Sequence, residues 1–149
     1  MINDIISKVE LHKSRAKNAL LEIKSWPSLN SDLFEDFEKI KTIDTFIYRF
    51  IKLQDMMGDK LFKIFLDEIG EYKDNMSLLD VLDKLEKFEI INDSYEWMEY
   101  RNLRNKLTHE YPNNEEDIVE GIQLAMIVFD KIEIIFNNII DYKNRKNLK

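Results

Sequence analysis

The chain has 149 residues, of which 44% are hydrophobic, and this size fits a single domain with a core of its own over residues 1–149. It contains no cysteine, which excludes disulfides, thiolate catalysis and cysteine-ligated zinc. The net charge of −7 argues against a general nucleic-acid coat protein. With only 3 glycines and 2 prolines, we expect long helices rather than many tight turns.

Apolar residues recur at helical spacing through the first half of the chain. They predict a first helix over residues 2–24, which Trp26 and Pro27 end, and a short amphipathic segment over 31–39. A long helix is expected from about residue 43 to 71, where Gly58 either kinks it or allows close packing. Its predicted core stripe contains Phe46, Phe50, Leu53, Met57, Leu61 and Ile64.

The second half has clearer helix boundaries. Ser77 with Asp80 predicts an N-cap and a helix over about 77–88. Residues 93–96 open the next helix, which ends near Pro112. Residues 113–117 cap a last helix that runs to about 142, and the basic tail from about 143 is expected to fray. No segment alternates like a strand, so we predict an all-α, up-down bundle of about five helices.

The last helix is apolar on more than one side. Its main predicted face includes Ile122, Phe129 and Phe136. Five further apolar residues fall outside that face, namely Leu124, Ile127, Val128, Ile134 and Ile135. A helix that is apolar on two sides is buried on two sides. A core on one side and a second chain on the other would account for the pattern.

The chain has no recognisable targeting or membrane segment. Its first residues contain no apolar run of signal-peptide length. No run approaches the ~20 apolar residues of a membrane-spanning helix. We therefore expect a cytoplasmic protein that makes no membrane contact.

The segment from Arg101 to Pro112 concentrates the residues that can perform chemistry. Arg104 offers a fixed cation, Asn105 a polar group that can position others, His109 a group that titrates near neutral pH, and Tyr111 a hydroxyl. Arg101 and Lys106 add cations to a stretch without acids, and they are candidate contacts for RNA phosphates. For Arg101, a surface arginine paired with a nearby acid is favoured over a phosphate contact.

The spacing sets how these groups can meet. Arg104 and His109 are five residues apart, which on a helix is ~140° of rotation and ~7.5 Å of rise. Arg104 must therefore reach round the helix or meet a histidine of another copy. His109 lies in the last turn, where the helix dipole favours the imidazolium and should raise its pKa. Pro112 disfavours helical geometry at Tyr111, so we expect Tyr111 near the surface.

These groups could cleave a phosphodiester without a metal ion. The arginine would bind the phosphate, and the histidine would exchange protons with a 2′-hydroxyl nucleophile or the leaving oxygen. That reaction requires RNA, because DNA lacks the hydroxyl. The alternative is an arginine and a histidine on a solvated helix face, with no catalytic role.

Three other groups of residues are interpreted as structural rather than catalytic or metal-binding. We expect His12 to be a partly buried ring with one hydrogen bond, and two histidines make a histidine-based metal site improbable. The acids Asp55 and Asp59 favour surface ion pairs with nearby lysines over a metal cluster. Core packing or a dimer contact is favoured over base stacking for the aromatic and methionine residues before the motif, Tyr95, Trp97, Met98 and Tyr100.

The segment resembles a known family pattern. Arg104, His109 and Tyr111 match the Arg-x4-His-x-Tyr motif of HEPN-domain proteins, specifically the HepT-like toxins. The resemblance covers eight residues, and the order of helices is compatible with it. It implies a dimeric all-α domain and a metal-independent endoribonuclease toxin without a cofactor. Arg104 and His109 would be its catalytic residues, and Asn105 a supporting one.

The resemblance also implies a partner. In this family a nucleotidyltransferase antitoxin of the MntA type silences the toxin by transferring AMP to the motif tyrosine, here Tyr111. Such a pair is a type VII-like toxin–antitoxin system. Adding a phosphate-bearing group two residues from His109 would block an RNA groove by bulk and by charge. The alternative is a non-catalytic helical partner or substrate-binding subunit of a nucleotidyltransferase.

Overall fold

The described part of the fold is built of helices, as the helical periodicity predicts. The computed structural model describes residues 1–109 and 114–146, except for the side chain of His109. Its helices are α1 (Ile2–Ser25), α2 (Phe37–Met56), α3 (Phe62–Glu68), α4 (Leu78–Lys87), α5 (Ser94–His109) and α6 (Glu115–Lys146). A π-helical turn, η2 (Met57–Leu61), joins α2 to α3 in one continuous helix, and a short 3₁₀ turn, η1 (Ser31–Glu35), precedes α2. No strand occurs in the described ranges, so the all-α class is confirmed.

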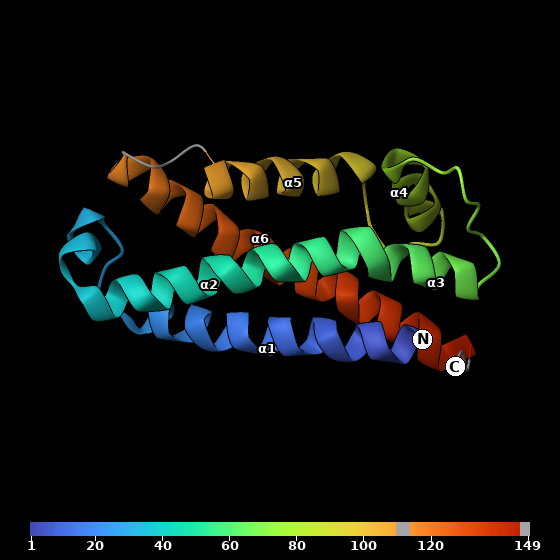
Figure 1. Ribbon diagram of the computed structural model, residues 1–149, viewed down its shortest axis with the longest axis horizontal. Coiled ribbons are helices and arrows are strands. Elements are labelled where there is room, and N and C mark those ends of the chain that lie inside the picture. Colours follow the sequence, from blue (N-terminus) through green and yellow to red (C-terminus); the bar gives the residue numbers. More distant parts are fainter. Residues whose placement is uncertain (110–113, 147–149) are drawn as a thin grey trace.

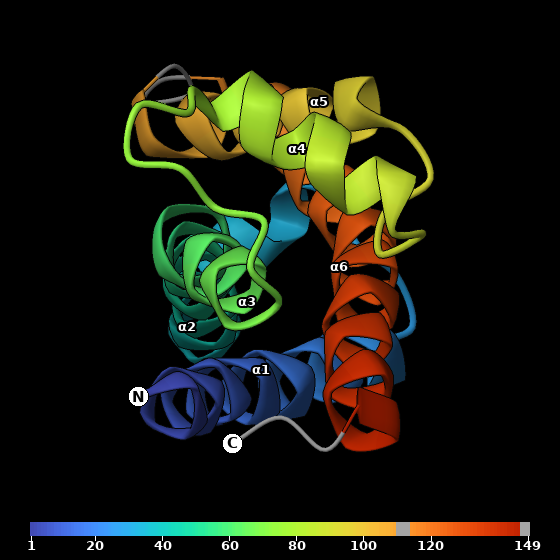
Figure 2. The same ribbon diagram turned by 90° about the vertical axis from the view of Figure 1, so that its right-hand side faces the viewer.

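The helices surround a common core. Figure 1 shows α1 and the α2–α3 helix running side by side along the length of the molecule, with α6 crossing behind them. Seen end-on, α1, α2 and α3, α6, and the pair of α4 and α5 lie around the centre (Figure 2). All of the α-helices contribute buried side chains to one hydrophobic cluster, and the largest of these side chains are aromatic.

Side-chain caps explain where α2, α4 and α6 begin. Ser77 and Asp80 form the predicted capping box at the start of α4. Asn114 caps α6 by accepting a hydrogen bond from the backbone N–H of Asp117 at 3.1 Å. The predicted start of the second long helix is wrong, because Asp36 caps α2 and accepts hydrogen bonds from the N–H groups of Glu38 and Lys39. The segment predicted over 31–39 shrinks accordingly to η1.

The basic tail is helical for longer than predicted. We expected fraying from about residue 143, whereas α6 continues to Lys146. Tyr142 packs edge-on against Phe65 with ring centroids 5.2 Å apart, which holds this part of α6 on the core. Arg145 and Lys146 lie over the Tyr142 ring, and cations in a last turn are favoured by the helix dipole.

The π turn changes which residues of α3 face the core. The N–H of Phe62 bonds to the carbonyl of Met57, five residues back instead of four. A regular helix predicts Ile64 in the stripe, but Phe62 and Phe65 are buried and Ile64 is only half-buried. The extra residue in the turn therefore shifts the apolar stripe by one position, and the prediction for Ile64 is corrected.

Gly58 lies in this turn and is a close-packing point. A Cβ atom at Gly58 would lie 3.4 Å from two atoms of the Trp97 indole, so the ring packs directly against the backbone of this turn. Trp97 also packs on Phe62, with ring centroids 4.7 Å apart. This contact fixes α5 against the α2–α3 helix. Among the described residues, the buried Gln54 amide and the Trp97 Nε1 have no hydrogen-bond partner.

The start of α5 is anchored by polar contacts as well. The Ser94 hydroxyl donates to Asp83 at 2.7 Å, and the Ser94 N–H donates to Glu86 at 2.9 Å, which ties α5 to α4. Within the described ranges, no helix combines the length and apolar composition needed to cross a bilayer.

Candidate functional site

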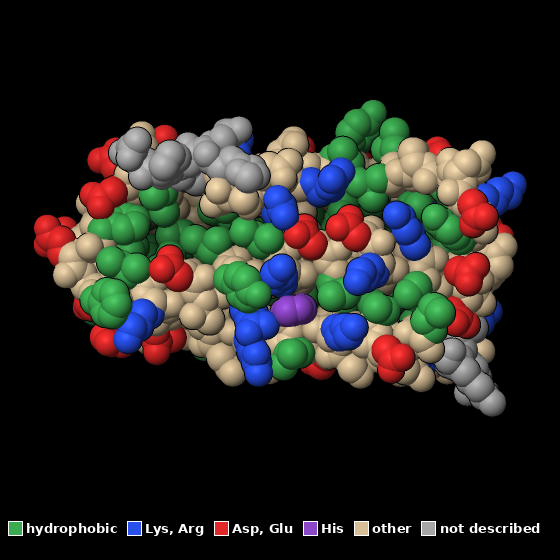
Figure 3. Space-filling view, in the orientation of Figure 1, with side chains coloured by type: hydrophobic (Ala, Val, Ile, Leu, Met, Phe, Trp, Pro, Cys, Tyr) green, Lys and Arg blue, Asp and Glu red, His purple; other side chains and the backbone are tan. Residues whose placement is uncertain are grey.

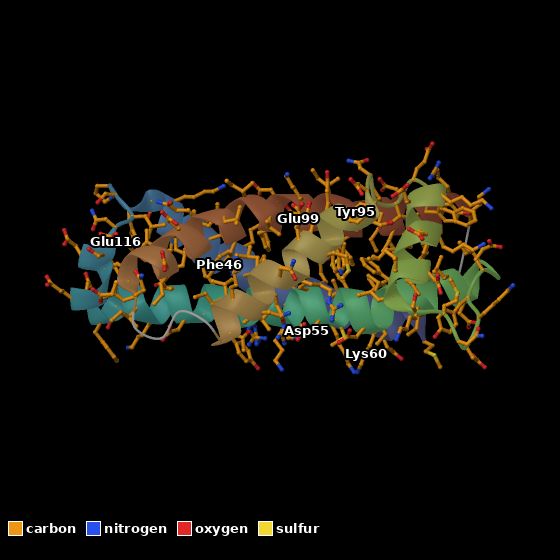
Figure 4. The ribbon with its side chains drawn as sticks, turned by 90° about the horizontal axis from the view of Figure 1, so that it is seen from above. Phe46, Asp55, Lys60, Tyr95, Glu99 and Glu116 are labelled. Atoms are coloured by element: carbon orange, nitrogen blue, oxygen red, sulfur yellow. The ribbon has the colours of Figure 1, made fainter. Side chains whose placement is uncertain are left out.

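Helix α5 directs Arg104 toward α2. Trp97 and Arg104 are seven residues apart, so they lie on nearly the same side of α5, separated by ~10.5 Å along its axis. Trp97 is fixed against Gly58, and Arg104 then reaches Asp55, one turn before Gly58 on α2. Figure 4 shows Asp55 on one side of α5, with Tyr95 and Glu99 on the other. The packing of the tryptophan thus determines where the motif arginine points.

Arg104 and Asp55 form a two-point ion pair. Arg104 Nε donates to Asp55 Oδ1 at 3.0 Å, and Arg104 Nη2 donates to Asp55 Oδ2 at 2.8 Å. The side chains are 25% and 37% exposed, so the pair is partly screened from water. The hydrogen bonds to Asp55 raise the pKa of Arg104 and outweigh the opposite effect of burial. Arg104 is a permanent cation with a fixed orientation.

The remaining donors of Arg104 point to what it can bind. An arginine side chain has five N–H groups. Two donate to Asp55, and one on Nη1 donates to the Asn105 side-chain oxygen at 3.3 Å. In the part of the chain that the structure describes, the other two N–H groups, one on each terminal nitrogen, have no acceptor. Two such groups at the end of a guanidinium match two oxygens of a phosphate.

The structure corrects the expected partners of two residues. Arg104 extends to α2 rather than round α5 toward His109. Asp55 pairs with an arginine 49 positions away in sequence rather than with a neighbouring lysine. Asp55 was not among the predicted site residues, and only its position in the fold reveals that it belongs there.

The other predicted site residues are only partly placed. Asn105 is exposed beside Arg104. Arg101 and Lys106 are also exposed, and neither forms an ion pair within the described ranges, so the predicted alternative of a paired Arg101 finds no support there. The backbone of His109 ends α5. Its side chain, and all of Tyr111 and Pro112, lie outside the described residues, so their predicted roles stay predictions.

No metal-ligand set occurs among the residues that the structure describes: no three histidine or acidic side chains come together in a way that could hold an ion. Of the aromatic residues before the motif, Trp97 and Tyr100 are buried, whereas Tyr95 is 75% exposed. Burial and the neighbouring Glu96 raise the pKa of Tyr100 to about 12, so its hydroxyl does not titrate near neutral pH.

His12 has the environment expected from the sequence. Its ring is half-buried, and Nδ1 lies 3.0 Å from Nη1 of Arg49, a geometry in which the neutral ring accepts the arginine's hydrogen bond. Burial lowers the pKa of His12, and the nearby charges of Arg49, Lys52 and Arg15 lower it further. The prediction of a partly buried ring with one hydrogen bond is confirmed.

We expect His12 to make the folded state sensitive to acid. Its pKa in the folded state is below 6.5, so the unfolded chain binds a proton that the folded chain does not as the pH falls through this value. The free energy of unfolding should therefore fall between about pH 7.5 and pH 5.5, and by less in His12→Gln, which cannot be protonated. Urea unfolding of both proteins at both pH values measures the difference. An equal loss in the two proteins would contradict the prediction.

An exposed apolar stripe follows one side of α6. Leu124, Ile127 and Ile134 are 49%, 56% and 59% exposed. Val128 and Ile135, which were predicted to lie with them, are buried in the core instead. The core-facing side of α6 is thus wider than predicted, and three large apolar residues remain on its outer side.

Comparison of the chain with protein-family models, with curated proteins and with solved structures finds no match in any of the three.

Proposed function

We propose that the protein is a metal-independent endoribonuclease toxin that resembles the HepT-like members of the HEPN family. The observation that carries the proposal is the state of Arg104. Asp55 and Asn105 hold its guanidinium in place, and two of its N–H groups have no acceptor in the described ranges. His109 ends the same helix five residues later, so a phosphate bound at Arg104 would lie near the end of α5.

The proposed reaction is an internal transfer at phosphorus. A base removes the proton of the ribose 2′-hydroxyl, the 2′-oxygen bonds to phosphorus, and the bond from phosphorus to the 5′-oxygen breaks. His109 would supply the proton that the leaving 5′-oxygen takes up, or accept the one from the hydroxyl. Arg104 would stabilise the negative charge that builds on the phosphate oxygens, and its fixed orientation costs no rearrangement during the reaction.

The proposed regulation rests on the resemblance. An MntA-like nucleotidyltransferase antitoxin would transfer AMP to Tyr111, two residues after His109. The added phosphate would compete with RNA phosphate for Arg104 and for its neighbours Arg101 and Lys106.

The exposed stripe on α6 supports a partner surface. Leu124, Ile127 and Ile134 follow each other at spacings of three and seven residues, which places them on one side of the helix. A second copy of the chain covering this side would give the proposed homodimer. The same stripe also favours the second candidate function, a non-catalytic helical subunit that binds a nucleotidyltransferase.

Cleavage of RNA by the purified protein tests the proposal. We expect the wild-type protein to cut total RNA in the presence of EDTA, and His109→Ala, purified in the same way, to cut at least about 100-fold more slowly. The sample should first be checked by mass for unmodified Tyr111 and by sedimentation for a dimer.

Two results would count against the ribonuclease. Equal cleavage by both proteins would point to a contaminating nuclease or to a site without His109. No cleavage by an unmodified dimer would favour the binding subunit, which should then form a stable complex with the nucleotidyltransferase.

A further inference from the structure

A group of cations that have no acidic partner among the described residues lies on the face formed by α1 and α2. Arg15 comes from α1, and Arg49 and Lys52 come from α2. Arg49 lies 5.2 Å and Lys52 5.5 Å from the ring centroid of Tyr48, which is 53% exposed. In Figure 3 lysine and arginine side chains surround a histidine in the middle of this face. We call Arg15, Tyr48, Arg49 and Lys52 the α1–α2 cluster.

The cations of the cluster are grouped together without carboxylate partners in the described residues. Several other cations do pair with acids: Lys13 and Lys17 with Glu133, and Lys84 with Glu71. Within the described residues, Arg15, Arg49 and Lys52 form no ion pair with a carboxylate. Like charges one helical turn apart repel each other. Because the protein has an excess of acids, a group of unpaired cations indicates a surface that meets an anion.

The neighbourhood of the cluster suits a nucleic-acid strand. A groove of about 400 Å³ between α1 and α2 is bordered by Arg15 and Arg49 and by the polar side chains of Asn18 and Thr45. One acid, Glu22, borders it as well and accepts a hydrogen bond from Thr42. Cations and hydroxyls bind phosphate and sugar, and an exposed tyrosine offers its ring to a base.

The cluster is continuous with the candidate site. Tyr48, Lys52 and Asp55 are spaced by four and three residues, so they lie along one side of α2. Tyr48 and Asp55 are separated by ~10.5 Å along the helix axis. Asp55 in turn holds Arg104. A single strand that contacts Arg104 could therefore continue along α2 to the cluster.

We propose that the α1–α2 cluster binds the single-stranded RNA substrate next to Arg104. Arg15, Arg49 and Lys52 contact its phosphates, and Tyr48 stacks on one base. The proposal rests on the proposed ribonuclease function for the identity of the ligand. It assigns the cluster to substrate binding and not to the chemical step.

Binding of RNA measured apart from cleavage tests the proposal. The probe is a fluorescently labelled single-stranded RNA of about 12 nucleotides, followed by anisotropy in EDTA with His109→Ala as the parent protein. Adding Arg49→Ala and Lys52→Ala should weaken binding at least about tenfold near 100 mM salt. It should also reduce the slope of log affinity against log salt by about 1.4, since each lost contact to a single strand removes about 0.7.

Tyr48→Ala should weaken binding about fivefold or more without changing the salt slope, because stacking involves no counterion release. Lys52→Ala alone leaves the bond between Arg49 and His12 intact and should reduce the slope by about 0.7. The matched control is Arg145→Ala with Lys146→Ala, which removes the same two charges from beside another tyrosine, Tyr142. It should change the salt slope by less than the cluster variant does.

The outcomes separate the two proposals. If the cluster variant binds RNA as tightly as the matched control does, or if the parent protein binds no RNA, the cluster is not an RNA site. This would hold even if the wild-type protein cuts RNA. If binding depends on the cluster but the wild-type protein never cuts RNA, the cluster proposal stands and the ribonuclease proposal fails.

Discussion

We expect Arg104→Ala to reduce RNA cleavage by about 10²–10³, the usual cost of removing one preorganised group that stabilises developing charge. Arg104 is already oriented by two hydrogen bonds to Asp55, so the variant loses a cation that needs no rearrangement to act. Arg104→Lys should not restore the rate, because an ammonium group cannot bind Asp55 at two points while presenting two donors to a phosphate. Single-turnover cleavage of a defined RNA measures the effect.

Two further variants show whether the effect is specific. Arg145→Ala removes an exposed arginine from the far end of α6 and should cut RNA at nearly the wild-type rate. Asp55→Asn keeps a group that can accept one hydrogen bond but loses the charge that orients Arg104, so its rate should lie between those of Arg104→Ala and the wild type. If Arg104→Ala cut RNA at the wild-type rate, the guanidinium would take no part in the reaction.

Trp97→Ala should reduce the free energy of unfolding by about 3–5 kcal/mol, the range observed when a large buried aromatic residue is truncated. Trp97 is 1% exposed and packs on Phe62 and Tyr100. Its removal leaves a cavity over Gly58, which has no side chain to fill it. Because the buried Nε1 has no hydrogen-bond partner among the described residues, the lost burial is slightly offset, and we expect the lower half of the range.

Urea unfolding followed by far-ultraviolet circular dichroism measures this change. Trp26→Ala is the matched control, since Trp26 is the other tryptophan and is only half-buried after α1. Trp26→Ala should lower the free energy of unfolding clearly less than Trp97→Ala does. Equal losses in the two variants would mean that the contact between Trp97 and Gly58 does not fix α5 in place.

The fold was predictable from the sequence where the signals are local. Ser77 and Asp80 are three residues apart and specify the start of α4 between themselves. Asp36 carries a similar signal for α2, but it lies in a segment whose apolar residues suggested a separate short helix. The one-residue shift of the apolar stripe in α3 had no sequence signal other than Gly58, because the π turn is defined by a single backbone hydrogen bond, from the N–H of Phe62 to the carbonyl of Met57.

The candidate site was predictable only in part, for a related reason. Arg104 and Asn105 are neighbours in a segment whose composition singles it out. Asp55 is 49 residues from Arg104 and is surrounded by other acids and lysines, so nothing local distinguishes it. The α1–α2 cluster is likewise assembled from two helices, and its residues look like ordinary surface charges along the chain.

The π turn also limits which insertions and deletions the protein can tolerate. Asp55 lies before the turn, and Phe62 and Phe65 lie after it. Because the π turn holds one extra residue, deleting one residue within Met57–Leu61 would let a regular α-helix form with Phe62 and Phe65 still in phase with Asp55. Inserting one residue while the π turn stays as it is would instead rotate everything downstream by ~100° relative to Asp55. Either the phenylalanines would leave the core or Asp55 would turn away from Arg104. This short segment can thus lose one residue but cannot gain one, since the core and the candidate site together fix the phase of the helix on its two sides.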